Sequence, residues 1–124
     1  MSNYEALAAF CSEGIDAGVE LERLGDDQLR YWINFLGKIT SRQQDYRSDS
    51  IYLEWNGIPI FCAGTGDILV VYAVEEETDG TMVATILLAG RKAPSNISLP
   101  AEALWTTDQM RHEVERRARI HFPG

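Results

Sequence analysis

The chain has 124 residues, with 19 acidic and 11 basic side chains and a formal net charge of −8. Its apolar share of 45% is ordinary for a globular domain and excludes a chain that is disordered throughout. The surplus of acid argues against broad, charge-driven binding to nucleic acid or to an anionic membrane, because phosphate groups are bound by clustered Lys and Arg. The length predicts a single domain, residues 1–124.

The charge is distributed unevenly along the chain. Residues 1–80 contain 15 acidic and 5 basic side chains, whereas residues 81–124 contain 4 and 6. Between residues 48 and 80 there are 7 acidic side chains and no Lys or Arg. Surfaces with charges of a single sign are usually avoided unless they steer a partner, so this stretch is a candidate binding surface.

The N-terminal part predicts two helices. Ser2 and Glu5 have the spacing of a capping box, which opens a helix that either ends near Gly14 or continues to Leu24. Asp26 is expected to cap the second helix. Apolar residues of this helix follow the spacing of one buried face: Leu29, Trp32, Ile33, Leu36 and Ile39.

Four strands are predicted next, over residues 51–55, 58–63, 67–75 and 81–89. The Asn56–Gly57 pair is typical of a two-residue hairpin turn. Pro59 has no N–H, so its strand is expected at an edge or with the missing donor pointing outward. The continuous apolar run in 67–75 predicts a central strand covered on both faces.

The strand over 81–89 is expected to place four apolar residues on one face: Met82, Ala84, Ile86 and Leu88. Because sequential strands usually pair, we predict a four-stranded antiparallel meander.

The C-terminal part predicts a short helical turn over residues 101–105 and a longer helix that begins at Thr106. Its buried face is expected to contain Met110, Val114, Ala118 and His121, and its ion pairs to join Glu113 with Arg117 and Glu115 with Arg119. The predicted fold is therefore α+β, with two N-terminal helices, the meander and a C-terminal helix packed on the sheet.

The acidic sheet supplies the candidate partner-binding residues. Carboxylates on its turns and strands suit a basic partner surface, and tyrosine is common at interfaces. The candidates are Asp49, Tyr52, Glu54, Asp67, Glu75, Glu76, Glu77 and Asp79.

A second hypothesis is a local anion site at Arg91 and Lys92, although the arginines of the last helix are also explained by ion pairing within the helix. No catalytic residues, metal ligands or cofactor are predicted. His112 begins H-E-x-x-R, in which Arg116 stands where the zinc motif H-E-x-x-H needs its second histidine.

Cys11 and Cys62 do not form a C-x-x-C pair, and the N-terminus has no signal-peptide pattern. We expect a cytoplasmic protein with reduced thiols, and a disulfide between the two cysteines is an open alternative. The longest apolar runs, 68–74 and 82–89, are shorter than the roughly 18 residues of a membrane-spanning helix.

Three segments, IYLEW (51–55), DILVVYAV (67–74) and TILLAGRKAP (85–94), resemble in part the RelE/ParE/HigB class of small toxins. The resemblance implies a small RNase-type toxin, with Tyr72, Arg91, Lys92 and His112 as the residues to test. The chain departs from this class because it starts with a helix and is acidic.

The sequence favours a small acidic binding protein over an enzyme. We expect an inhibitor that covers the basic surface of a nuclease toxin, as an immunity protein, or of a nucleic-acid-binding defence complex, as a phage or mobile-element inhibitor of the anti-CRISPR kind. The alternatives are the small RNase-type toxin and a structural or assembly subunit. A homodimer is also open.

Overall fold

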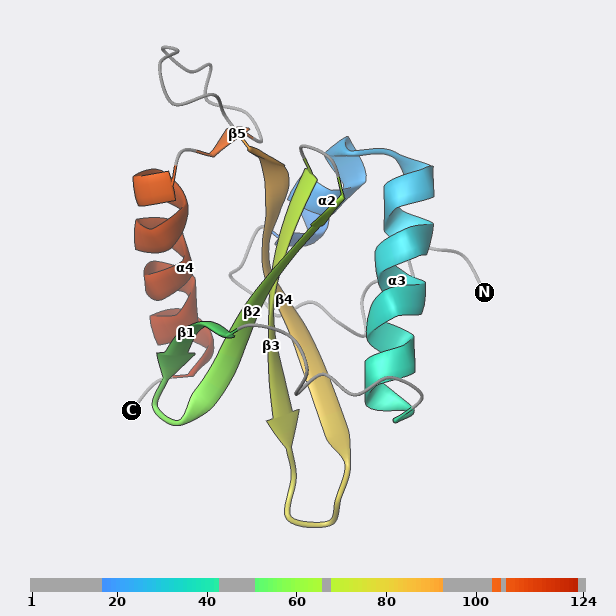
Figure 1. The fold of residues 1–124 in the computed structure, drawn as a ribbon, viewed down its shortest axis with the longest axis vertical. Coiled ribbons are helices and arrows are strands. Elements are labelled where there is room, and N and C mark those ends of the chain that lie inside the picture. The colour runs from blue at the N-terminus through green and yellow to red at the C-terminus, as the bar shows by residue number, and fades with distance from the viewer. Residues whose placement is uncertain (1–16, 43–50, 66–67, 93–103, 106, 123–124) are drawn as a thin grey trace.

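The strands form one sheet whose order follows the sequence (Figure 1). The computed structural model describes residues 17–42, 51–65, 68–92, 104–105 and 107–122. Antiparallel pairing joins β1 (Ile51–Trp55), β2 (Ile58–Thr65), β3 (Ile68–Glu76) and β4 (Met82–Lys92), and β5 (Leu104–Trp105) pairs with β4 in parallel. The described helices are α2 (Ala17–Arg23), α3 (Asp26–Thr40) and α4 (Thr107–His121). The predicted α+β fold, with helices before and after a four-stranded meander, is confirmed.

Helices cover both faces of the sheet. The rings of Phe35 and Tyr72 lie 5.7 Å apart, which places α3 on one face. On the other face, Thr85 Oγ1 of β4 lies 3.4 Å from His121 Nε2 of α4. Figure 1 shows α3 and α4 on opposite sides of the sheet. The central strand β3 is therefore covered on both faces, as predicted, and its residues from Val70 to Val74 are buried.

The start of α3 differs from the prediction. Gly25, not Asp26, is the N-cap residue, and no side chain caps the helix. Gly25 has a φ of 102°, a conformation that glycine adopts without the clash of a Cβ atom. Asp26 and Asp27 instead lie in the first turn, where negative charge is favourable to the helix dipole. The predicted apolar face is confirmed, with Leu29, Trp32, Leu36 and Ile39 buried and Ile33 partly buried.

The β1–β2 turn has the predicted geometry, but β2 is not an edge strand. Asn56 and Gly57 both have positive φ, and Trp55 pairs with Ile58. β2 lies between β1 and β3, so the expected edge position is wrong. Pairing of β2 with β3 begins only at Ile60. Pro59 therefore lies outside the β2–β3 ladder, where its missing N–H costs no ladder hydrogen bond.

A β-bulge changes the faces of β4. Val71 of β3 pairs with Leu88, whereas the next residue, Tyr72, pairs with Ile86, so Leu87 is an extra residue. Successive residues of a strand point to opposite faces, and paired residues share a face. Ile86 and Leu88 consequently lie on opposite faces, and the prediction that both share one face is wrong.

The C-terminal region holds two further corrections. Leu104–Trp105 form strand β5 instead of a helical turn. In α4 the predicted pair of Glu113 with Arg117 is confirmed at 2.8 Å, but Glu115 pairs with Arg111 at 3.2 Å. Arg119 instead lies over the ring of Trp55, with its Cζ atom 5.7 Å from the centroid. The predicted buried residues Met110, Val114 and Ala118 are confirmed, and His121 is half-buried.

A buried ion pair connects α2, β4 and α4. Arg117 donates from Nη1 and Nη2 to the two carboxylate oxygens of Glu20, at 2.6 and 2.9 Å. The same Nη1 donates to the carbonyl oxygen of Leu87 at 2.8 Å, and Ala89 N donates to Glu20 Oε1 at 3.2 Å. The Arg117 and Glu20 side chains are only 3% and 8% exposed. Burial by itself lowers the pKa of Arg117, but the hydrogen bonds that Arg117 donates to Glu20 and Glu113, together with the charges of these carboxylates, outweigh this effect and the pKa is raised.

Several sequence predictions concern residues outside the described ranges. Among them are the capping box of Ser2 and Glu5, the cap at Thr106 and the state of Cys11. Cys62 is a free, half-buried cysteine, and burial raises the pKa of its thiol. None of the helices that the structure describes is long and apolar enough to cross a membrane.

Candidate functional site: the acidic hairpin

The turn between β3 and β4 carries four of the predicted partner-binding residues. We call residues 75–81 the acidic hairpin. Glu75 is half-buried, whereas Glu76, Glu77 and Asp79 are exposed. The buried part of β3 ends at Val74, so the chain beyond it lies outside the core. Figure 1 shows this hairpin extending past the ends of α3 and α4. Its carboxylates are therefore accessible to a large partner without obstruction by either of those helices.

Hydrogen bonds within the turn fix its shape. Glu77 N donates to the carbonyl oxygen of Thr81 at 2.8 Å, and Gly80 N donates to that of Glu77 at 2.9 Å. Thr81 N donates to Asp79 Oδ1 at 2.9 Å. Gly80 has a φ of +89°, which a residue with a side chain rarely adopts. The loop thus presents its carboxylates from an ordered backbone, which reduces the entropy lost on binding.

The Asp79 carboxylate is stabilised in its charged form. The side chain of Thr81 and then its backbone amide hydrogen-bond to this carboxylate and lower the pKa of Asp79 below its ordinary value. Asp79 is fully exposed, so the effect is local. At neutral pH the tip of the hairpin therefore carries a negative charge held in a fixed position.

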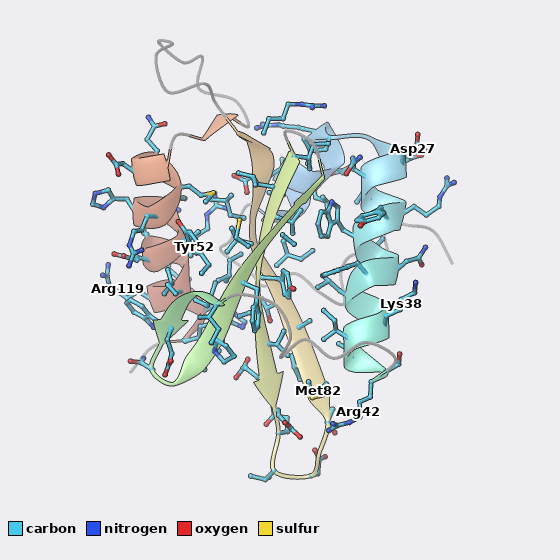
Figure 2. All side chains as sticks on the ribbon, viewed as in Figure 1. Asp27, Lys38, Arg42, Tyr52, Met82 and Arg119 are labelled. Carbon is cyan, nitrogen blue, oxygen red and sulfur yellow. The ribbon has the colours of Figure 1, made fainter. Side chains whose placement is uncertain are left out.

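Arg42, which follows the end of α3, binds the acidic hairpin from outside residues 48–80, the stretch without Lys or Arg. Its Nη2 donates to Glu76 Oε1 at 3.2 Å and to the carbonyl oxygen of Gly80. Figure 2 shows Arg42 reaching the hairpin close to Met82. Arg42 has a φ of 62°, which turns the chain sharply after the helix. One arginine thus offsets part of the charge of Glu76 and fastens the hairpin to α3.

The other predicted partner-binding residues do not all lie on this hairpin. Glu54 is exposed on β1, and the β1–β2 and β3–β4 turns lie at the same end of the sheet in Figure 1. Tyr52 is half-buried between the sheet and α4 (Figure 2), and its hydroxyl oxygen is enclosed without a hydrogen-bond partner in the described part of the chain. Burial also raises the pKa of this hydroxyl. Asp49 and Asp67 lie outside the described residues.

The predicted anion site lies away from the acidic hairpin. Arg91 and Lys92 end β4, whereas the hairpin precedes the start of this 11-residue strand. The Arg91 side chain is half-buried, and its backbone pairs with Leu104 of β5. The two charged regions therefore belong to opposite ends of one strand.

The structure describes the surroundings of two residues that the toxin resemblance singles out, Tyr72 and His112. Tyr72 is fully buried, with its ring stacked on that of Phe61 at 5.5 Å, so it cannot contact a substrate in this structure. His112 is exposed on α4. Among the residues described, no group of three His, Cys, Asp or Glu side chains could hold a metal ion.

The comparisons with known proteins give no family for this chain. No protein-family model, no curated protein and no solved structure matches it.

Proposed function

We propose that this protein is a small binding protein of the cytoplasm that uses the acidic hairpin to cover a basic surface of a nucleic-acid-binding protein. The observation that carries the proposal is the projection of an ordered, carboxylate-rich turn beyond α3 and α4. A nuclease toxin or a defence complex that binds nucleic acid has a basic surface of this kind. On this proposal the chain acts as an inhibitor, because its carboxylates occupy the surface where phosphates bind.

Charge complementarity supports this choice of partner. Opposite potentials accelerate encounter and orient the two surfaces, while like charges reject wrong partners. Glu77 and Asp79 are exposed at the tip, and Thr81 N donates a hydrogen bond that holds the Asp79 carboxylate in place. Arg42 holds the base of the hairpin, which keeps these groups in place.

The test compares two variants that lose the same number of carboxylates. The first is Glu75→Gln, Glu77→Gln and Asp79→Asn in the hairpin; the Asp79→Asn substitution retains an amide oxygen that can accept from Thr81 N. The control is Asp26→Asn, Asp27→Asn and Asp108→Asn, all at exposed positions on α3 and α4. Each variant and the wild-type chain serve as immobilised bait in a lysate, and the captured proteins are identified and eluted with a salt gradient.

The proposal predicts that the wild-type and control baits retain the same basic protein and that the hairpin variant loses it. Retention must also weaken as salt rises, because exposed charges are screened within about 10 Å at 0.1 M salt. Equal retention by the two variants, or retention that salt does not change, would contradict the proposal. Capture of no basic protein by the wild-type bait would contradict it as well.

A further inference from the structure

Along residues 82–90, the outer edge of β4 has the bulge at Leu87 but neither a charged side chain nor a proline, which are common protections of an edge strand. These residues read MVATILLAG. In the described part of the chain, a strand joins this edge only at Arg91 and Lys92, where β5 begins. Apolar, uncharged edges of this length tend to pair with another chain, and natural proteins block them with charges, proline, bulges or covering elements.

The buried ion pair lies on this edge. Leu87 is the bulged residue, and its carbonyl oxygen accepts from Arg117 Nη1 at 2.8 Å. Two residues further on, Ala89 N donates to Glu20 Oε1 at 3.2 Å. Residues two apart direct their backbone groups to the same side of a strand. The Arg117 donor and the Glu20 acceptor therefore bind the Leu87 carbonyl and the Ala89 amide on one edge of β4.

The arrangement reproduces what a neighbouring strand provides. A residue in an adjacent strand directs its own N–H donor and its own C=O acceptor to the edge. Here the guanidinium of Arg117 supplies the donor and the carboxylate of Glu20 supplies the acceptor. Their direct bonds of 2.6 and 2.9 Å hold the two side chains together across the edge, from α4 and α2.

We propose that the Glu20–Arg117 pair takes the place of a neighbouring strand at β4 and blocks pairing of this edge with the same edge of a second copy of the chain. A second copy is the expected partner because two identical edges related by a twofold axis pair antiparallel with themselves. The charges that residues 82–90 lack are thus supplied by α2 and α4. This role is independent of the acidic hairpin.

The experiment compares two double variants at the same positions. Glu20→Leu with Arg117→Met removes both backbone partners and both charges. Glu20→Gln with Arg117→Lys retains an acceptor for Ala89 N and a donor for the Leu87 carbonyl. Molar mass is measured by light scattering after gel filtration over a wide range of concentration, with circular dichroism as the check of folding.

The Leu/Met variant is expected to gain a species of twice the wild-type mass as concentration rises, while the Gln/Lys variant keeps the wild-type mass. Adding Val83→Lys to the Leu/Met variant is expected to abolish the heavier species, because a lysine on this edge, opposite Glu75, disfavours strand addition. A folded Leu/Met variant that keeps the wild-type mass overturns the proposal, and so does equal association of both double variants or persistence of the heavier species with Val83→Lys.

Hydrogen exchange of the wild-type protein tests the proposal even where the Leu/Met variant does not fold. The Ala89 amide is expected to be protected as strongly as the amides within the β3–β4 ladder, because Glu20 accepts its hydrogen bond. Exchange of this amide at the rate of an open strand edge overturns the proposal.

Discussion

Replacing Arg117 with methionine tests how strongly the buried ion pair stabilises the fold. Methionine keeps most of the length and apolar stem of the side chain but removes the charge and all its donors. Glu20, whose side chain is only 8% exposed, then retains the hydrogen bond from Ala89 N but loses its cation. The Leu87 carbonyl loses its bond from Arg117 as well.

The expected loss is about 3–5 kcal/mol in the free energy of unfolding, the usual range when one partner of a buried ion pair is removed. For a domain of this size it corresponds to a fall of about 12–20 °C in Tm. The matched control is Arg116→Met on the same helix, where the side chain is 52% exposed and pairs with Glu113. We expect the control to cost less than about 1 kcal/mol.

Urea denaturation followed by tryptophan fluorescence measures the free energy of unfolding of Arg117→Met and of Arg116→Met. Adding Glu20→Leu to Arg117→Met should recover part of the loss, because an apolar pair leaves no buried charge without its partner. Equal free energies of unfolding for Arg117→Met and Arg116→Met, or a larger loss on adding Glu20→Leu, would show that the buried ion pair does not stabilise the fold in this way.

Three further predictions concern local structure and pH. Gly64→Ala should destabilise the protein by about 1–3 kcal/mol, since a Cβ at this position would lie 2.7 Å from the carbonyl oxygen of Ile68; an unchanged urea midpoint would contradict this. Gly57→Ala should cost about 1–2 kcal/mol, because the turn holds this residue at a φ of +81°, and a thermal melt equal to that of the wild type would oppose the turn assignment. Hydrogen bonds from Arg116, above all, lower the pKa of Glu113 from its ordinary value of 4.5. The ionised Glu113 therefore stabilises the fold above that pH, and this stabilisation is lost as pH falls through the lowered pKa. The Glu113→Gln variant should consequently lose less free energy of unfolding on acidification than the wild type does. Parallel pH profiles of the variant and the wild type would count against this prediction.

Local sequence patterns predicted most of the fold. Periodicity identified α3, and the Asn56–Gly57 pair set the first hairpin, because both signals depend on residues close in the chain. The bulge at Leu87 and the strand β5 were missed, since both depend on pairing between distant residues. These are tertiary effects that local propensity does not encode.

The candidate site was predicted only in part. The acidic hairpin follows from its composition, but Arg42 lies 34 positions before Glu76 and no sequence signal indicated their contact. For Arg117 a signal existed, because it lies seven residues after Met110 on the buried face of α4. Its partner Glu20, 97 residues away, could not be identified from spacing.

The most direct test of the proposed function is the association rate of the captured basic partner, measured by stopped flow at several ionic strengths. We expect the rate constant to fall steeply with salt for the wild-type chain, since electrostatic steering acts on encounter. We also expect the hairpin variant to associate more slowly at low salt and to depend less on salt, while the Asp26, Asp27 and Asp108 control resembles the wild type. A rate constant that salt does not change, or equal rates for the hairpin variant and the wild-type chain, would rule out binding through the acidic hairpin.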